Sequence, residues 1–238
     1  MKWFKLLVAV VLLPTCAALT LTTWKLGHSL AFGQQLAGSN ISIVAFCAGY
    51  AVWLEIFALL PKPMRMYVLG HELTHALWAM MMGARVSGLK VKKTGGQVKT
   101  SKTNCLIVLA PYFFPFYAVL FSILFFIAHA IWNLTEYYWV LFFLIGLGWS
   151  FHVTFTLMML LSVRQPDVRS QGVLFSAVVI YLMNLLTIIL TATMFSHNLT
   201  FSALANSFGH DCLLAYGWTL DKLSALWQDV AAFGRRKG

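Results

Sequence analysis

The chain has 238 residues, of which 60% are hydrophobic and 10% are charged, and its mean hydropathy is +0.79. A soluble fold of this composition would lack the polar residues needed to cover its surface, so we predict that lipid surrounds much of the chain. The 17 Lys and Arg residues outnumber the 7 Asp and Glu residues and give a net charge of +10. These cations lie mainly at the ends of apolar segments, which is typical of anchoring at lipid headgroups and argues against a nucleic-acid partner.

Six apolar segments follow one another along the chain. A bilayer core about 30 Å thick requires about 20 helical residues per span, and we expect helices at 3–24, 41–60, 64–83, 105–131, 138–161 and 172–195. The first segment carries Lys2 and Lys5 at its start and resembles a signal peptide, so removal of this segment by cleavage is one of two alternatives. Its apolar character continues to Trp24, which favours an uncleaved anchor.

A β-hairpin is predicted between the third and fourth of these helices. Residues 85–100 alternate apolar and polar side chains about the pair Gly95-Gly96, which is a turn signal. Near the carboxyl end, apolar residues at helical spacing predict an amphipathic helix over 221–233. We therefore expect an all-α polytopic membrane protein with about six transmembrane helices and one short hairpin, organised as one membrane-embedded domain over 1–200 and a tail over 201–238.

The third apolar segment contains the motif His71-Glu72-Leu73-Thr74-His75. On a helix, histidines four residues apart lie on one face and can bind one metal ion, and Zn²⁺ is the expected ion. Glu72 is placed to act as a general base toward a water molecule. A chance match whose polar groups pair with neighbouring helices is the alternative, but three ionisable residues within an apolar segment are costly unless they face a cavity or a metal.

A hydrolytic zinc site generally uses three protein ligands, so a third donor is needed. Asp167 is the preferred candidate, because Pro166 breaks the chain between two spans and allows a side chain there to point back into the bundle. The alternative for Asp167 is a helix cap or an ion pair with Arg164 or Arg169. His152, within the fifth span, is the next candidate ligand, and it could instead contact substrate or a ligand.

Two further polar residues fall inside predicted spans. Glu55 would either be protonated or pair with the free N–H of a ligand histidine. Asn184 could donate a hydrogen bond to substrate or join two helices.

The run Gly70-His71-Glu72-Leu73-Thr74-His75-Ala76-Leu77, followed by Gly83 and by a hairpin with Gly95-Gly96, resembles the site-2 protease family of intramembrane metalloproteases. The resemblance covers roughly residues 64 to 185. It implies a zinc ion bound by His71, His75 and a distant aspartate, Glu72 as general base, and a hairpin that presents substrate as a strand. The Leu-Asp-Gly of the family is here Pro166-Asp167-Val168, so Asp167 is assigned by position and order.

The function expected from these features is zinc-dependent hydrolysis of peptide bonds in or near transmembrane segments of membrane proteins. Two alternatives stay open: a metal-binding membrane protein that does not cleave, and an inactive protease-like scaffold that binds transmembrane segments. The expected partners are a membrane protein or transmembrane peptide and the lipid bilayer, and the expected location is the bacterial inner membrane. The sequence indicates no oligomeric state.

Overall fold

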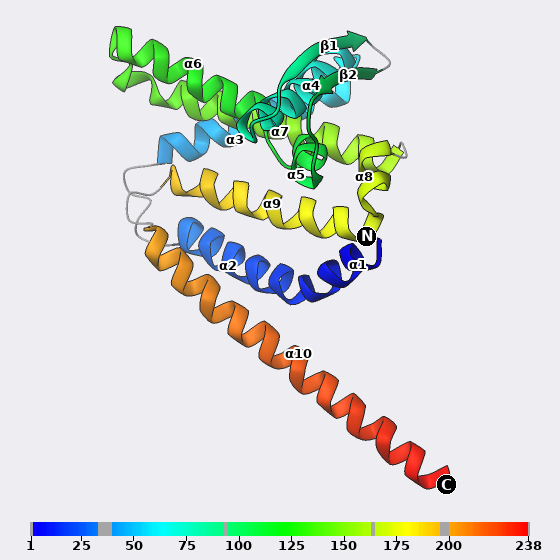
Figure 1. Ribbon diagram of the computed structural model, residues 1–238. Helices are drawn as coiled ribbons and strands as arrows, with labels where there is room; N and C mark the ends of the chain where they lie inside the picture. Colours follow the sequence, from blue (N-terminus) through cyan, green and yellow to red (C-terminus); the bar gives the residue numbers. More distant parts are fainter. Residues whose placement is uncertain (1, 33–39, 93–94, 163–164, 196–199, 238) are drawn as a thin grey trace.

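The computed structural model describes residues 2–32, 40–92, 95–162, 165–195 and 200–237 and is almost entirely helical (Figure 1). Its helices and strands, in chain order, are α1 (Lys2–Val11), α2 (Leu13–Phe32), α3 (Asn40–Leu59), α4 (Met64–Met81), β1 (Val86–Lys92), β2 (Gly95–Thr100), α5 (Cys105–Leu109), η2 (Ala110–Tyr112), α6 (Phe116–Trp132), η3 (Thr135–Tyr137), α7 (Tyr138–Ser162), α8 (Pro166–Gln171), α9 (Val173–Thr193) and α10 (Phe201–Lys237).

Three helical segments are long and apolar enough to cross a membrane: Ile41–Leu59, Thr135–Ser162 and Val173–Thr193. Among the described residues the number rises to five if each of two bent helix pairs counts as one span. The six expected spans are therefore not confirmed. The remaining candidate is α4, whose apolar character is diluted by the polar residues of the histidine motif.

Two of the expected straight helices are bent. The segment expected at 105–131 turns by 83° between Tyr112 and Phe116, because Pro115 cannot continue the preceding hydrogen-bond ladder and starts α6 instead. The amino-terminal segment bends by 41° between α1 and α2. The tail is also more regular than expected, since α10 is one continuous helix of 37 residues that extends away from the rest of the molecule (Figure 1).

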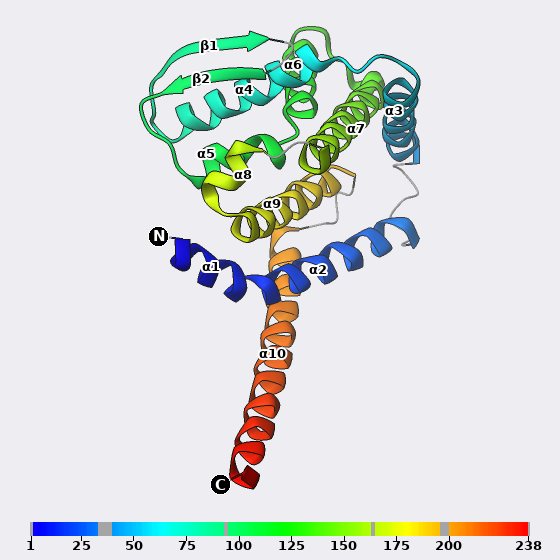
Figure 2. The ribbon, with the colours of Figure 1, turned by 90° about the vertical axis from the view of Figure 1, so that its right-hand side faces the viewer.

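The predicted hairpin is present as two antiparallel strands, in which Leu89 pairs with Val98 and Val91 pairs with Gly96. Gly95 and Gly96 were expected to form the turn, but they begin β2, and residues 93–94 between the strands lie outside the described part. The hairpin folds back over α4 (Figure 2). Val91 packs against a core cluster that joins α3, α4 and α7, so the hairpin is attached to the helical bundle along the helix that carries the motif.

The tightest helix contact joins α3 and α7. A Cβ on Gly49 would overlap the carbonyl oxygen of Phe143, and a Cβ on Gly146 would overlap the carbonyl oxygen of Phe46. Small residues at a helix crossing allow backbones to approach closely, which replaces the hydrophobic driving force that is missing in lipid. This crossing places α7 beside α4 and so forms one wall of the region around the motif.

Candidate metal centre

The helix α4 directs His71 and His75 toward the same point. Their rings lie with centroids 4.9 Å apart, as expected for residues separated by four positions on a helix. Asp167, from the first turn of α8, lies opposite them: its Oδ2 is 3.5 Å from Nε2 of His71 and 3.6 Å from Nε2 of His75. One ligand atom from each of these three residues lies within 4.8 Å of the others.

Two of the three separations within this group match those of a tetrahedral metal site. Ligand atoms about 2.0–2.2 Å from a tetrahedral zinc ion lie about 3.3–3.6 Å from one another. The two nitrogen-to-oxygen distances, 3.5 and 3.6 Å, fall within that range. Two imidazoles and one carboxylate, with a fourth position left for water, are also a donor set that suits zinc. The group could therefore hold a metal ion.

Each histidine has a partner for its other ring nitrogen. Nδ1 of His75 lies 2.8 Å from the carbonyl oxygen of Ile107, and because a carbonyl only accepts, this nitrogen carries the proton. Nε2 of His75 then keeps its lone pair for a metal. Nδ1 of His71 lies 3.3 Å from the hydroxyl of Tyr67. Such contacts orient the rings of metal-ligating histidines.

Asp167 is held by Tyr112, which is completely buried in η2. The Tyr112 hydroxyl lies 3.1 Å from Oδ2 of Asp167 and 3.2 Å from Oε1 of Gln165, and it can donate to either. Burial alone would raise the pKa of Asp167, but the imidazoles of His71 and His75 outweigh burial and hold the pKa below its ordinary value. The carboxylate form is the form that binds a metal ion.

Glu72 is buried on α4 and faces the hairpin. A backbone hydrogen bond from Val98 of β2 reaches its carboxylate. Gly96 of the same strand approaches so closely that a Cβ there would stand 2.8 Å from Oε1 of Glu72. Gly96 thus lets the strand backbone pass beside the carboxylate, a close approach that explains a glycine at this position of the strand.

A cavity of about 690 Å³ contains all four of these side chains. Its lining includes His71, Glu72, His75 and Asp167 on one side and residues of β2 from Gly95 to Val98 on the other. Among the described strands β2 pairs only with β1, so no further strand covers its second edge, and residues of β2 line this cavity.

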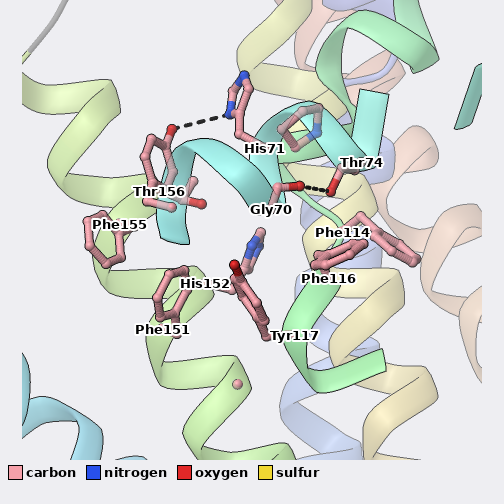
Figure 3. A pocket seen from close by; sticks show the side chains of 13 residues that line it. Gly70, His71, Thr74, Phe114, Phe116, Tyr117, Phe151, His152, Phe155 and Thr156 are labelled. Atoms are coloured by element: carbon pink, nitrogen blue, oxygen red, sulfur yellow. Dashed lines mark hydrogen bonds between the residues drawn. The ribbon is translucent and has the colours of Figure 1, made fainter. Parts of the chain in front are cut away.

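His152 lies on the other side of α4 and is not one of the three clustered donors (Figure 3). It lines a hollow of about 30 Å³, together with His71, between α4, α6 and α7. Its Nε2 lies 3.3 Å from Oδ1 of Asn184, and the amide nitrogen of Asn184 donates to the carbonyl oxygen of Tyr112 at 2.9 Å. Asn184 therefore links His152 to the segment that carries Tyr112, and the residue that lies with His71 and His75 at metal-binding distance is Asp167.

Glu55 does not approach this centre. It is exposed on α3 and lines neither of the two cavities described above. The predicted pairing of Glu55 with one of these histidines is therefore wrong, since Nδ1 of His71 faces Tyr67 and Nδ1 of His75 faces Ile107. Of the two ion-pair partners considered for Asp167, Arg164 lies outside the described residues, and Asp167 faces the two histidines rather than Arg169.

Four groups near this centre carry no signal that the sequence predictions used: Tyr67, Tyr112, Gln165 and the carbonyl of Ile107. Tyr67 precedes His71 by four residues, so helical spacing could have placed it beside that ring. No local sequence pattern marks Tyr112 or Ile107, because their contacts depend on how the break between α5 and α6 packs against α4 and α8.

Comparisons of the chain with protein-family models, curated proteins and solved structures find no match.

Proposed function

We propose that the chain is a zinc-dependent endopeptidase that hydrolyses peptide bonds in or near transmembrane segments. The observation that carries the proposal is the convergence of two histidines and one aspartate at metal-ligand spacing, with a buried glutamate next to the first histidine. The edge of β2 that lies along the same cavity supports a peptide substrate over a small molecule. The three apolar helices long enough to span a membrane support a membrane-embedded substrate.

His71, His75 and Asp167 would hold the ion, and the chemistry of zinc in such a site is Lewis acidity toward a carbonyl oxygen and a water molecule. Glu72 accepts the proton of the attacking water while the oxygen of that water bonds to the carbonyl carbon. The same carboxyl then gives the proton to the amide nitrogen as the carbon–nitrogen bond breaks, which releases an acid and an amine. Glu72 is restored, and water is the only reagent consumed.

In this reaction the hairpin would hold the substrate in an extended conformation. A peptide bond within a helix has its backbone groups engaged and is shielded by side chains, so a transmembrane helix must unwind before cleavage. The free edge of β2 can accept the exposed backbone of an unwound segment as an additional strand. The contact between Gly96 and Glu72 then fixes the distance between that strand and the base.

The test uses the full chain purified in detergent, with zinc measured by mass spectrometry. A library of single-span transmembrane peptides is incubated with the wild type and with the Glu72→Gln variant, and new termini are identified. We expect near-stoichiometric zinc in both proteins and new termini with the wild type alone. The same products from well-folded Glu72→Gln would exclude its role as base. A zinc-loaded wild type that cleaves no peptide would favour a metal-binding protein without proteolysis.

A further inference from the structure

A further cavity, of about 390 Å³, lies between the start of α1 and the junction of α8 with α9. Three cations line it: Lys2 and Lys5 from α1 and Arg169 from α8. No acidic side chain is among the described residues of its lining, and none of the ion pairs between described residues involves these three cations. The cavity therefore presents uncompensated positive charge, which favours an anionic ligand.

The positions of these cations are defined by the fold. Lys5 is half-buried, its Nζ donates a hydrogen bond to Oε1 of Gln171, and it lies 5.6 Å from the centre of the Phe175 ring. Arg169 is on the exposed side of α8, a helix that ends at Gln171. Residues far apart in the sequence thus converge on one groove, which separates this feature from a run of lysines along a surface.

The surface next to the cations is apolar. Leu6 of α1 and Val173 and Leu174 of α9 also line the groove, and all three side chains are exposed. Helix α9 is one of the segments able to span a membrane, and the groove lies at its first turn, where lipid headgroups are found. A ligand that contacts the whole groove needs an anionic group to pair with the cations and a hydrocarbon part to cover the exposed apolar side chains.

We propose that this groove binds an anionic phospholipid, with its phosphate between Lys2, Lys5 and Arg169 and its acyl chains along α1 and α9. Free phosphate would leave the apolar side uncovered, and a zwitterionic lipid would bring the positive charge of its own headgroup to a site that already holds three cations. The volume of about 390 Å³ lies within the range of roughly 300–1,000 Å³ found for small-molecule sites. The proposal does not depend on the proteolytic activity.

The experiment is native mass spectrometry of the full chain in detergent, titrated with phosphatidylglycerol or with phosphatidylcholine of the same acyl chains. The variant carries Lys2→Gln, Lys5→Gln and Arg169→Gln. A matched variant loses two lysines and one arginine outside the groove, through Lys62→Gln, Arg65→Gln and Lys222→Gln. Because each cation near a lipid surface contributes a share of the binding energy, we expect the groove variant to bind phosphatidylglycerol at least about tenfold more weakly, and the matched variant to bind within about twofold of the wild type.

Several results would overturn the proposal: equal binding of phosphatidylglycerol by the groove variant and the wild type, an equal loss in both triple variants, or equal binding of the two lipids by the wild type. Inorganic phosphate that displaces the lipid at a similar concentration would identify a general anion site instead. Should the triple variant fail to fold, Arg169→Gln and Arg169→Lys are compared, and retention of binding by the lysine variant alone supports the proposal. Zinc content is measured in each variant, since Arg169 is close to Asp167 on α8.

Discussion

Gly96 of β2 and Glu72 of α4 are in contact, and a Cβ on Gly96 would stand 2.8 Å from Oε1 of Glu72. The backbone of β2 therefore limits where the Glu72 carboxylate can lie, and the carboxylate limits how closely β2 can approach α4. This relationship ties the hairpin to the proposed chemistry, because the strand that would align a substrate also sets the place of the base.

Gly96→Ala should lower the rate of peptide cleavage by about 100-fold, since a methyl group there must displace either the carboxylate or the strand, and small misplacements at a reacting centre are costly. Zinc content should stay at the wild-type level. Gly88→Ala, in β1 of the same hairpin, is the control, because a Cβ on Gly88 would lie 4.0 Å from its nearest neighbour, the Lys99 side chain. Cleavage by Gly96→Ala at the wild-type rate would show that this contact has no part in the reaction.

Asp167→Ala should lose zinc, with affinity reduced by at least about 100-fold, because removal of a direct ligand costs more than the loss of a group that orients a ligand. His152→Ala should keep its zinc, since His152 lies outside the three-residue group. Mass spectrometry of the purified variants gives the metal content. The opposite result, with zinc retained in Asp167→Ala and lost in His152→Ala, would reassign the third ligand.

Tyr112→Phe removes the hydroxyl that lies 3.1 Å from Oδ2 of Asp167 while it keeps the buried ring. We expect zinc affinity to fall about 10- to 100-fold, the range typical of groups that orient a metal ligand. Tyr216→Phe, whose hydroxyl contacts Thr15 and Val11, is the matched control. Competition with a zinc chelator gives both affinities, and an unchanged value for Tyr112→Phe would contradict the orienting role.

Asn184→Leu should destabilise the fold by about 1–3 kcal/mol, because it leaves the N–H of His152 and the carbonyl of Tyr112 without their partner in a buried region. His152→Leu combined with Asn184→Leu should cost less than the sum of the two single changes, since the two residues share one hydrogen bond. Thermal unfolding of the four proteins measures this coupling. Additive effects would argue that the hydrogen bond between His152 and Asn184 contributes nothing.

Gly146→Ala should lower the stability by about 1–3 kcal/mol or more, because the added methyl group would overlap the carbonyl oxygen of Phe46 and separate α3 from α7. Gly27→Ala on α2 is the control, since nothing lies within 4 Å of its Cβ position. Alanine should be neutral or stabilising at that open helical position. Thermal unfolding compares the pair, and an equal response would mean that the crossing has room to adjust.

The sequence by itself determined the features that depend on neighbours within a few residues. The spacing of His71 and His75 placed two imidazoles on one helical face, and the alternation over 85–100 indicated the hairpin. The lengths of the apolar segments predicted where most of the helices lie. These predictions succeed because helical and strand periodicities are local, so they can be read from a short window.

Only the tertiary structure decided which distant groups meet. Asp167 was one of two candidates for the third ligand, and its place beside His71 and His75 depends on how α8 packs against α4. The roles of Tyr112 and Gly96, the exposure of Glu55 and the sharp bend before α6 depend in the same way on packing between helices. Such contacts have no local signature, because the side chains that form them come from segments far apart in the sequence. The pattern within one segment does not show which other segment packs against it.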